Sequence, residues 1–313
     1  MAGDPVHRRA AVLGKPIAHS LSPVLHRAAY AALGLSGWTY DAVELDERGL
    51  AGFVAGLDDT WRGLSLTMPL KRACLDVADE VSELAAQVGA GNTLARLPDG
   101  RWRADNTDVG GIVDALRPHW DAGGVADAHR TLSAAPGAAP PIAGVGNSAP
   151  VGGVPCSVSA SPIGVLGAGA TALSALFALR ELGATTVRVY ARRPEQAADL
   201  AARGPALGLT VSVGELARWS AGAEPVLLST LPADAWDAAP LEWPEPRRSA
   251  TRLVFDVVYA GWPTPLARAA GAAGATVVGG RDMLVYQAVR QFRQFTGVAA
   301  PVDAMFAAVR EAG

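Results

Sequence analysis

The sequence predicts an α/β protein with two domains, the second built around a doubly wound parallel sheet. Three observations carry this prediction. Short apolar runs alternate with longer segments of helical periodicity along most of the chain. A stretch rich in Pro, Gly, Ala and Ser interrupts this alternation near the middle of the sequence. The chain has 313 residues, which is enough for two domains of ordinary size.

The region before the interruption alternates between strands and helices. Pro23 falls in the first turn of the first helix, where proline is tolerated, and Pro118 is expected to end the third helix. Pro98-Asp99-Gly100 is a turn sequence that joins the last two strands into a hairpin. The expected strands cover residues 10–14, 38–43, 63–66, 89–95 and 102–104, and the expected helices cover 21–33, 49–57 and 107–116.

The interruption spans residues 121–160 and is predicted to be a flexible insert, because it shows no stable periodicity. Regular structure resumes with a strand at Ile163 and a helix that continues to Leu182. We expect one domain from residues 1–120 and 281–313, with its terminal helices packing back across it, and the other from residues 161–280. Further strands are expected at 186–191, 209–213, 225–229, 253–258 and 276–278, and further helices at 195–203, 266–273, 283–295 and 302–309.

Composition excludes several classes of function. The formal net charge of −3 leaves no basic footprint for nucleic acid or for an anionic membrane. No apolar run reaches the roughly 20 residues of a membrane-spanning helix, and the first residues lack the apolar stretch of a signal peptide. Cys74 and Cys156 lie far apart without metal-binding spacing. Neither a disulfide framework nor a metal site is therefore expected, and the default location is a reducing cytoplasm.

A glycine-rich motif opens the second domain. Gly167, Gly169 and Ala172 form G-x-G-x-x-A between an apolar strand and a helix. The first glycine permits a tight turn, the second lets the backbone approach a pyrophosphate, and the small alanine lets helix and strand pack closely. Because strand, turn, helix and second strand form one βαβ unit, the motif predicts a Rossmann-type dinucleotide-binding domain.

The end of the next strand predicts which dinucleotide binds. In NAD sites an Asp or Glu usually accepts a hydrogen bond from the ribose 2′-hydroxyl at this position. This chain has Arg192 and Arg193 there and no carboxylate. A guanidinium suits a 2′-phosphate through its permanent charge and its fork geometry. We therefore predict NADP as the cofactor.

Small polar residues gather in the first domain where strands end and helices or turns begin. Ligands of α/β sheets bind at the carboxyl ends of strands. Four clusters of this kind, together with one lysine, predict a polyol site in the cleft between the domains. The clusters are Ser20-Leu21-Ser22-Pro23, Thr67-Met68-Pro69-Leu70-Lys71, Gly91-Asn92-Thr93 and Asp105-Asn106-Thr107-Asp108.

In order and spacing, the sequence resembles the shikimate dehydrogenase family. The motifs are P-I-A-H-S-L-S-P at 16–23, L-T-M-P-L-K at 66–71, G-N-T-L at 91–94, D-N-T-D at 105–108 and G-R-D-M-L-V-Y-Q at 280–287. The resemblance covers nearly the whole chain except 121–161. It implies an NADP-dependent oxidoreductase that reversibly reduces 3-dehydroshikimate to shikimate, a reaction of chorismate and aromatic amino-acid biosynthesis.

The resemblance also implies which residues bind the substrate. Ser20 and Ser22 would bind its carboxylate, with the Tyr259 hydroxyl assisting. The ring hydroxyls would be held by Thr67, Asn92 and Gln287.

Lys71 and Asp108 would be the catalytic pair. Hydride transfer to a ketone builds negative charge on oxygen, which needs a proton donor and a nearby cation. Which of the two residues exchanges the proton stays open. His19 and His26 have no identifiable partner and are interpreted as structural. The implied cofactor-binding residues are Gly167, Gly169, Ala170, Ala172, Arg192, Arg193 and Gly280.

The chain departs from the family pattern at several positions. Ser65 stands where the family usually has Asn, so the ring-hydroxyl contact there is expected to be lost or shortened. On the cofactor side, Ala191-Arg192-Arg193 replaces the usual Asn-Arg-Thr. Two alternatives stay open: a dehydrogenase of quinate or another cyclitol acid, and a non-catalytic ligand-sensing protein on the same scaffold. The partner expected is a small-molecule substrate, and a homodimer is one candidate assembly.

Overall fold

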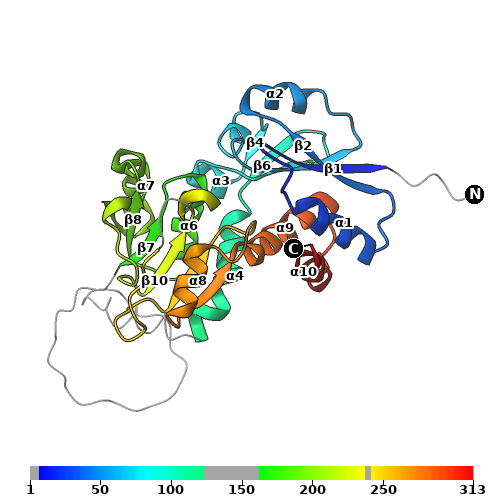
Figure 1. The fold of residues 1–313 in the computed structure, drawn as a ribbon. Helices are drawn as coiled ribbons and strands as arrows, with labels where there is room; N and C mark the ends of the chain where they lie inside the picture. The colour runs from blue at the N-terminus through cyan, green and yellow to red at the C-terminus, as the bar shows by residue number, and fades with distance from the viewer. Residues whose placement is uncertain (1–6, 123–161, 237–240, 313) are drawn as a thin grey trace, which may run out of the picture.

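The structure is a computed structural model that describes residues 7–122, 162–236 and 241–312. Two sheets lie apart, and helices α4 (Asp108–Ala122) and α9 (Gly280–Thr296) run between them (Figure 1). The predicted α/β class is thereby confirmed. The insert predicted over 121–160 lies outside the described residues, apart from its first two, which belong to α4. Cys156 lies outside them as well.

The first sheet has six strands in the order β2-β1-β3-β5-β6-β4. Strand β1 runs parallel to β2 and β3, whereas β5 runs antiparallel to β3 and β6. The antiparallel pair β5–β6 is the hairpin that the turn sequence predicts. The bounds are β1 (Arg8–Gly14), β2 (Trp38–Glu44), β3 (Trp61–Leu66), β4 (Glu80–Val81), β5 (Thr93–Arg96) and β6 (Trp102–Asp105).

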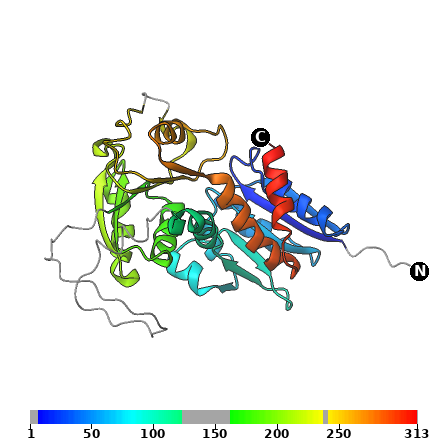
Figure 2. The same ribbon diagram turned by 90° about the horizontal axis from the view of Figure 1, so that it is seen from below.

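Alternating side chains of β1 show how both faces of this sheet are covered. Ala10 and Val12 pack in a core with α1 (Ser22–Ala32), α9 and α10 (Val302–Glu311). Ala11 and Leu13 point to the opposite face, into a core shared with α2 (Glu47–Ala55). Residues 280–311 therefore lie against the N-terminal sheet, as Figure 2 shows from below.

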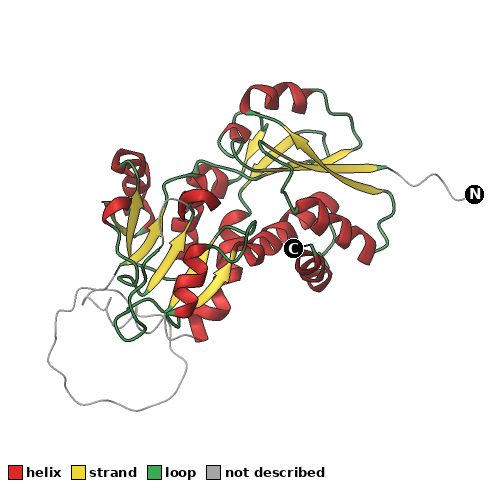
Figure 3. Ribbon diagram, in the orientation of Figure 1, coloured by secondary structure: helices red, strands yellow, loops and turns green. Residues whose placement is uncertain are grey.

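The second sheet is wholly parallel, in the order β12-β11-β10-β7-β8-β9. The chain leaves the central strand β7 toward β8 and β9, then returns to build β10, β11 and β12 on the other side. Helices α4 and α6 (Ala170–Glu181) cover one face and α8 (Pro265–Ala272) the other (Figure 3). The strands are β7 (Ile163–Leu166), β8 (Thr186–Ala191), β9 (Thr210–Glu215), β10 (Val226–Ser229), β11 (Leu253–Asp256) and β12 (Thr276–Gly279).

Several element boundaries differ from the sequence predictions, each for a local reason. The prediction that Pro118 ends its helix is wrong, because α4 continues to Ala122. Trp120 is buried in the core shared with α6, and this packing outweighs the one hydrogen bond that proline removes. Helix α2 begins earlier than expected because the Asp46 carboxylate accepts a hydrogen bond from Gly49 N at 3.3 Å.

Two further differences concern short elements. The helix expected over 195–203 divides into a 3₁₀ turn at Pro194–Ala197 and α7 (Ala198–Arg203). Helix α3 (Glu83–Val88) is not predicted by periodicity, because its six residues are too few to show one. Within the described residues, no helix is long and apolar enough to cross a membrane.

Candidate active site

A cleft between the two sheets has a cavity volume of about 200 Å³ and is partly open to solvent. Every side chain that the sequence analysis assigns to substrate binding or catalysis lines it. They come from six separate segments of the chain, so the fold brings together residues that are far apart in the sequence. These residues are Ser20, Ser22, Thr67, Lys71, Asn92, Asp108, Tyr259 and Gln287.

Lys71 and Asp108 form an ion pair at the centre of this cleft. The Lys71 Nζ atom lies 2.7 Å from Asp108 Oδ2, and the two side chains are 17% and 5% exposed. Lys71 follows β3, and its carbonyl accepts a hydrogen bond of 2.7 Å from Gly91 N, which fixes the backbone below the ammonium group. Asp108 is the first residue of α4, where the helix dipole favours a carboxylate.

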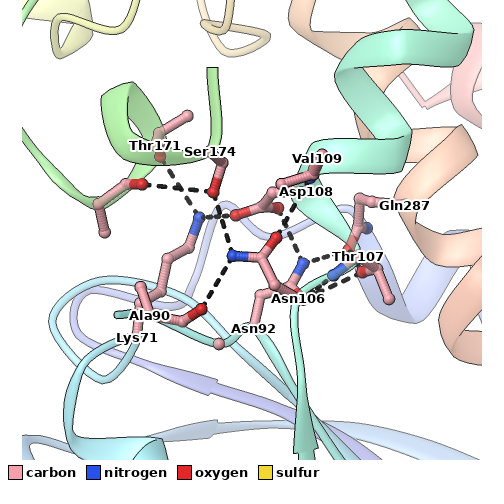
Figure 4. Close-up of polar contacts among 12 residues, drawn as sticks. Lys71, Ala90, Asn92, Asn106, Thr107, Asp108, Val109, Thr171, Ser174 and Gln287 are labelled. Carbon is pink, nitrogen blue, oxygen red and sulfur yellow. Dashed lines mark hydrogen bonds and ion pairs between the residues drawn. The ribbon is translucent and has the colours of Figure 1, made fainter. Parts of the chain in front are cut away.

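Asn92 holds the other oxygen of Asp108. Its Nδ2 donates to Asp108 Oδ1 at 2.8 Å and to Gln287 Oε1 at 3.2 Å, as Figure 4 shows. Its Oδ1 accepts from the backbone N–H of Thr107 at 2.8 Å. Because the carboxamide oxygen is held by Thr107, the amide nitrogen is turned toward the carboxylate.

Helix α6 of the second sheet reaches the ion pair across the cleft. Lys71 Nζ donates to Thr171 Oγ1 at 3.4 Å, and Asn106 Nδ2 donates to Ser174 Oγ at 3.1 Å (Figure 4). Thr171 and Lys71 also line a neighbouring cleft together with Gly169. Lys71 therefore stands where the substrate cleft meets the cleft at the glycine-rich turn.

The remaining predicted substrate residues stand around the ion pair. Ser22 is buried at the start of α1, and its backbone N–H donates to Ser20 Oγ at 3.4 Å. Tyr259 follows β11 and enters the cleft from the second sheet. Burial raises the pKa of Tyr259 above its ordinary value, so its phenol keeps its proton and can donate a hydrogen bond. Gln287 projects from α9, where its Nε2 donates to Leu284 O at 2.8 Å.

Gln291 and Ser65 also line the cleft, although neither is among the residues predicted to bind substrate. Gln291 lines the cleft one helical turn after Gln287, and Ser65 lines it two residues before Thr67. Each lies on the same face of its element as the predicted residue, because helices repeat every three to four residues and strands every two. This spacing is a signal that could have identified Gln291, whereas Ser65 is already identified in the sequence as a departure from the family pattern. The Ser65 hydroxyl is engaged within the protein, since it accepts from Tyr40 Oη at 2.6 Å and donates to Gln291 Oε1 at 2.7 Å.

The glycine-rich turn has the geometry that a dinucleotide needs. Gly167 has φ of +106°, and a Cβ there would lie 2.4 Å from Thr230 Oγ1. Gly169 caps α6 without a side-chain hydrogen bond, and a Cβ on it would have no atom within 4 Å. The first amide groups of the helix therefore face open space. Ala170 begins α6, and Ala172 is fully buried, as close packing of helix and strand requires.

The other predicted cofactor residues lie at two strand ends. Arg192 and Arg193 follow β8, and both are exposed. Gly280 begins α9 directly after β12 and lines the substrate cleft. A Cβ on Gly280 would lie 2.0 Å from Val257 O, so only glycine fits there.

Neither histidine singled out in the sequence belongs to the cleft lining. His26 is fully buried, and its ring stacks on Tyr40 with a centroid distance of 4.1 Å. Burial lowers the pKa of His26 to about 3, so the ring is neutral at physiological pH. His19 is exposed.

Two family models match the chain. The shikimate dehydrogenase substrate binding domain matches residues 12–94, and the shikimate 5′-dehydrogenase C-terminal domain matches residues 280–310. Shikimate dehydrogenase (NADP(+)) of Salinibacter ruber is 35% identical over 310 residues, covering 96% of this chain and 95% of its own.

Solved structures give the same result. The crystal structure of Mycobacterium tuberculosis shikimate dehydrogenase is 37% identical with a TM-score of 0.76, covering 97% of this chain and 99% of its own. A Thermus thermophilus shikimate 5-dehydrogenase, solved in complex with NADP(H) and shikimate, is 32% identical with a TM-score of 0.74, covering 98% and 100%.

Proposed function

Since the chain belongs to the shikimate dehydrogenase family, we propose that it catalyses the reversible, NADP-dependent reduction of 3-dehydroshikimate to shikimate. The observation that carries the proposal is the Lys71–Asp108 ion pair in a cleft lined by polar side chains from both sheets. A ligand-sensing protein needs the binding side chains but not this pair. The pair therefore favours an enzyme over the sensor.

Two regions of the cleft wall would bind different parts of the substrate. Ser20 and Ser22, at the N-terminus of α1, offer hydroxyl donors to the substrate carboxylate, and the protonated Tyr259 faces the same cleft. On the other side, Thr67, Asn92 and Gln287 offer groups that match ring hydroxyls.

Lys71 has the geometry to deliver the proton. An ammonium group has three N–H donors, and Lys71 uses one toward Asp108 and one toward Thr171. The third is left for the substrate oxygen that becomes negative during reduction. Both oxygens of Asp108 already accept hydrogen bonds, from Lys71 and Asn92, so its role is to hold Lys71 charged and in place. In the reverse direction Lys71 accepts the proton back.

The second sheet supplies residues that fit a bound NADP. The amide groups in the first turn of α6 suit the pyrophosphate, and the exposed Arg192 and Arg193 suit the 2′-phosphate. When bound, the cofactor supplies the hydride. Gly280, which has no room for a side chain, keeps the wall of the cleft flat beside Val257.

The test replaces Lys71 with methionine, which keeps the length of the side chain and removes its charge. The purified protein is assayed with 3-dehydroshikimate and NADPH by the loss of NADPH absorbance. Because the proton donor is lost, kcat should fall by roughly a hundredfold or more, while NADPH binding measured by fluorescence without substrate is retained. Lys15→Met is the matched control, since Lys15 is the other lysine of the chain and its side chain is 54% exposed.

Three outcomes would contradict the proposal. Near-normal turnover in Lys71→Met would refute the role of Lys71. A higher kcat/KM with quinate and oxidised cofactor than with shikimate would favour the cyclitol-acid alternative. Tight binding of shikimate without any turnover in the wild-type protein would favour the sensor.

The proposal includes the larger organisation of the protein. Residues 1–120 with 281–313 form the substrate domain and 161–280 the NADP domain, with the 121–160 insert between them. The enzyme works in the cytoplasm, which agrees with the free and buried Cys74 thiol. A homodimer is the assembly to test, by light scattering on the purified full chain.

A further inference from the structure

A chain of buried hydrogen bonds runs behind the substrate cleft from β2 to the Lys71–Asp108 pair. It starts at Tyr40, which is fully buried and donates to Ser65 Oγ at 2.6 Å. Ser65 in turn donates to Gln291 Oε1 at 2.7 Å. These two bonds join β2 and β3 to helix α9, and the second of them links residues that are 226 positions apart.

Gln291 in turn forms hydrogen bonds with Asn92 and its neighbour Thr93. Its Nε2 donates both of its hydrogens, to Asn92 O at 2.9 Å and to Thr93 Oγ1 at 3.0 Å. Thr93 Oγ1 then donates to Asn92 Oδ1 at 2.9 Å. One carboxamide therefore fixes the backbone of Asn92 directly and its side chain through Thr93. Gln291 is 0% exposed, so water does not compete for these bonds.

Asn92 completes the connection to the ion pair. Because its Oδ1 is held by Thr93 and by Thr107 N, its Nδ2 is directed at Asp108 Oδ1. A hydrogen bond donated to a carboxylate favours the charged form, and Lys71 is the charged group that faces Asp108 from the opposite side. The orientation of Asn92 therefore governs how firmly Asp108 holds the ammonium.

We propose that Gln291 is a positioning residue for the reaction, acting through Asn92 on Asp108 and Lys71. The inference rests on the proposed function, since it assigns Gln291 to the same cleft. Ser65 is part of the same device. Its hydroxyl accepts from Tyr40 and donates to Gln291, so it links β2 to the carboxamide of α9 that bonds Asn92.

The experiment compares two glutamines of α9. Gln291→Met keeps the side-chain length and removes every hydrogen bond of the carboxamide. Gln294→Met is the matched control, because Gln294 also donates from α9 to the hairpin, to Asp105 Oδ2 at 2.7 Å, but lies outside the chain of bonds to Asp108. The kcat and the KM for shikimate oxidation are measured in both variants, together with the melting temperature.

Gln291→Met should lower kcat roughly tenfold, about the effect of losing one well-placed hydrogen bond. Its KM for shikimate should stay near the wild-type value, because Gln291 is fully buried and contacts Asn92 rather than the substrate. Gln294→Met should match the wild-type kcat and KM. If Gln291→Met does not fold, Thr93→Val carries the test, since it removes only the hydroxyl that links Gln291 to Asn92 Oδ1.

Each other result overturns the inference. A rise in the KM for shikimate with unchanged kcat would show that Gln291 binds substrate directly. A lower melting temperature with wild-type kinetics would show a purely structural role. Equal effects in both glutamine variants would show that the chain of bonds is not specific. Absence of turnover in the wild-type protein would instead contradict the proposed function itself.

Discussion

His26 should make the protein less stable in mild acid, and replacing it with phenylalanine should remove that sensitivity. The ring is fully buried, stacked on Tyr40 and close to Phe292 and Phe295. Neither ring nitrogen makes a well-formed hydrogen bond within the described residues, and the Gln291 carboxamide that faces the ring already bonds Ser65 and Asn92. Phenylalanine therefore fits the aromatic surroundings.

The size of this loss of stability follows from the pKa of His26, which burial lowers from 6.5 to about 3 in the folded protein. Between these values the unfolded chain binds a proton that the folded protein does not. Protonation of His26 therefore does not reduce the free energy of unfolding above pH 6.5, and it reduces this free energy progressively as the pH falls below 6.5. At pH 5 the unfolded histidine lies about 1.5 units below its pKa, and each unit is worth about 1.4 kcal/mol. The folded state should thus lose about 2 kcal/mol between pH 7 and pH 5 through His26 alone.

The assay is urea denaturation at pH 7 and pH 5 in wild type and His26→Phe, with His19→Gln as a control at an exposed histidine. Comparing the differences between the two pH values cancels the contribution of all other titrating groups. The wild type and the control should lose about 2 kcal/mol more than His26→Phe. An equal loss in wild type and His26→Phe would refute the reasoning, because it would mean that His26 can be protonated in the folded state.

Two further predictions concern the second sheet. Replacing both Arg192 and Arg193 with alanine should raise the KM for NADPH roughly tenfold and leave the KM for NADH almost unchanged, because a guanidinium recognises the 2′-phosphate that only NADPH carries. Equal changes in the KM for both cofactors would contradict this prediction. Thr171→Val should lower kcat roughly threefold at unchanged melting temperature, because it removes the hydroxyl 3.4 Å from Lys71 Nζ while keeping the side-chain volume. Thr171→Ser, which keeps the hydroxyl, should retain wild-type turnover.

The sequence predicts the cleft better than it predicts the elements around it. Lys71, Asn92 and Asp108 stand in polar motifs at the ends of strands, where a short segment carries enough information to place the side chain. Pro118 shows the opposite case. Its effect on the helix depends on the packing of Trp120 against α6, which lies beyond the insert and leaves no local trace in the sequence.

Gln291 shows why part of the site escapes prediction. Its spacing from Gln287 could place it on the cleft wall, but no sequence pattern reveals its hydrogen bonds to Ser65 and Asn92, which lie far away in the chain. Ser65 stands where the family usually has Asn, a change expected to lose or shorten a contact with a ring hydroxyl. In the structure the Ser65 hydroxyl bonds Tyr40 and Gln291 of α9.

Helix α9 also has a consequence for the order in which the protein can fold during translation. The face of β1 that carries Ala10 and Val12 is covered by α9 and α10, whose residues leave the ribosome after the whole of the second sheet. During synthesis of the second sheet, the apolar face of the first sheet therefore stays exposed. The active site can form only after Gln287 and Gln291 of α9, which line the cleft, have been synthesised.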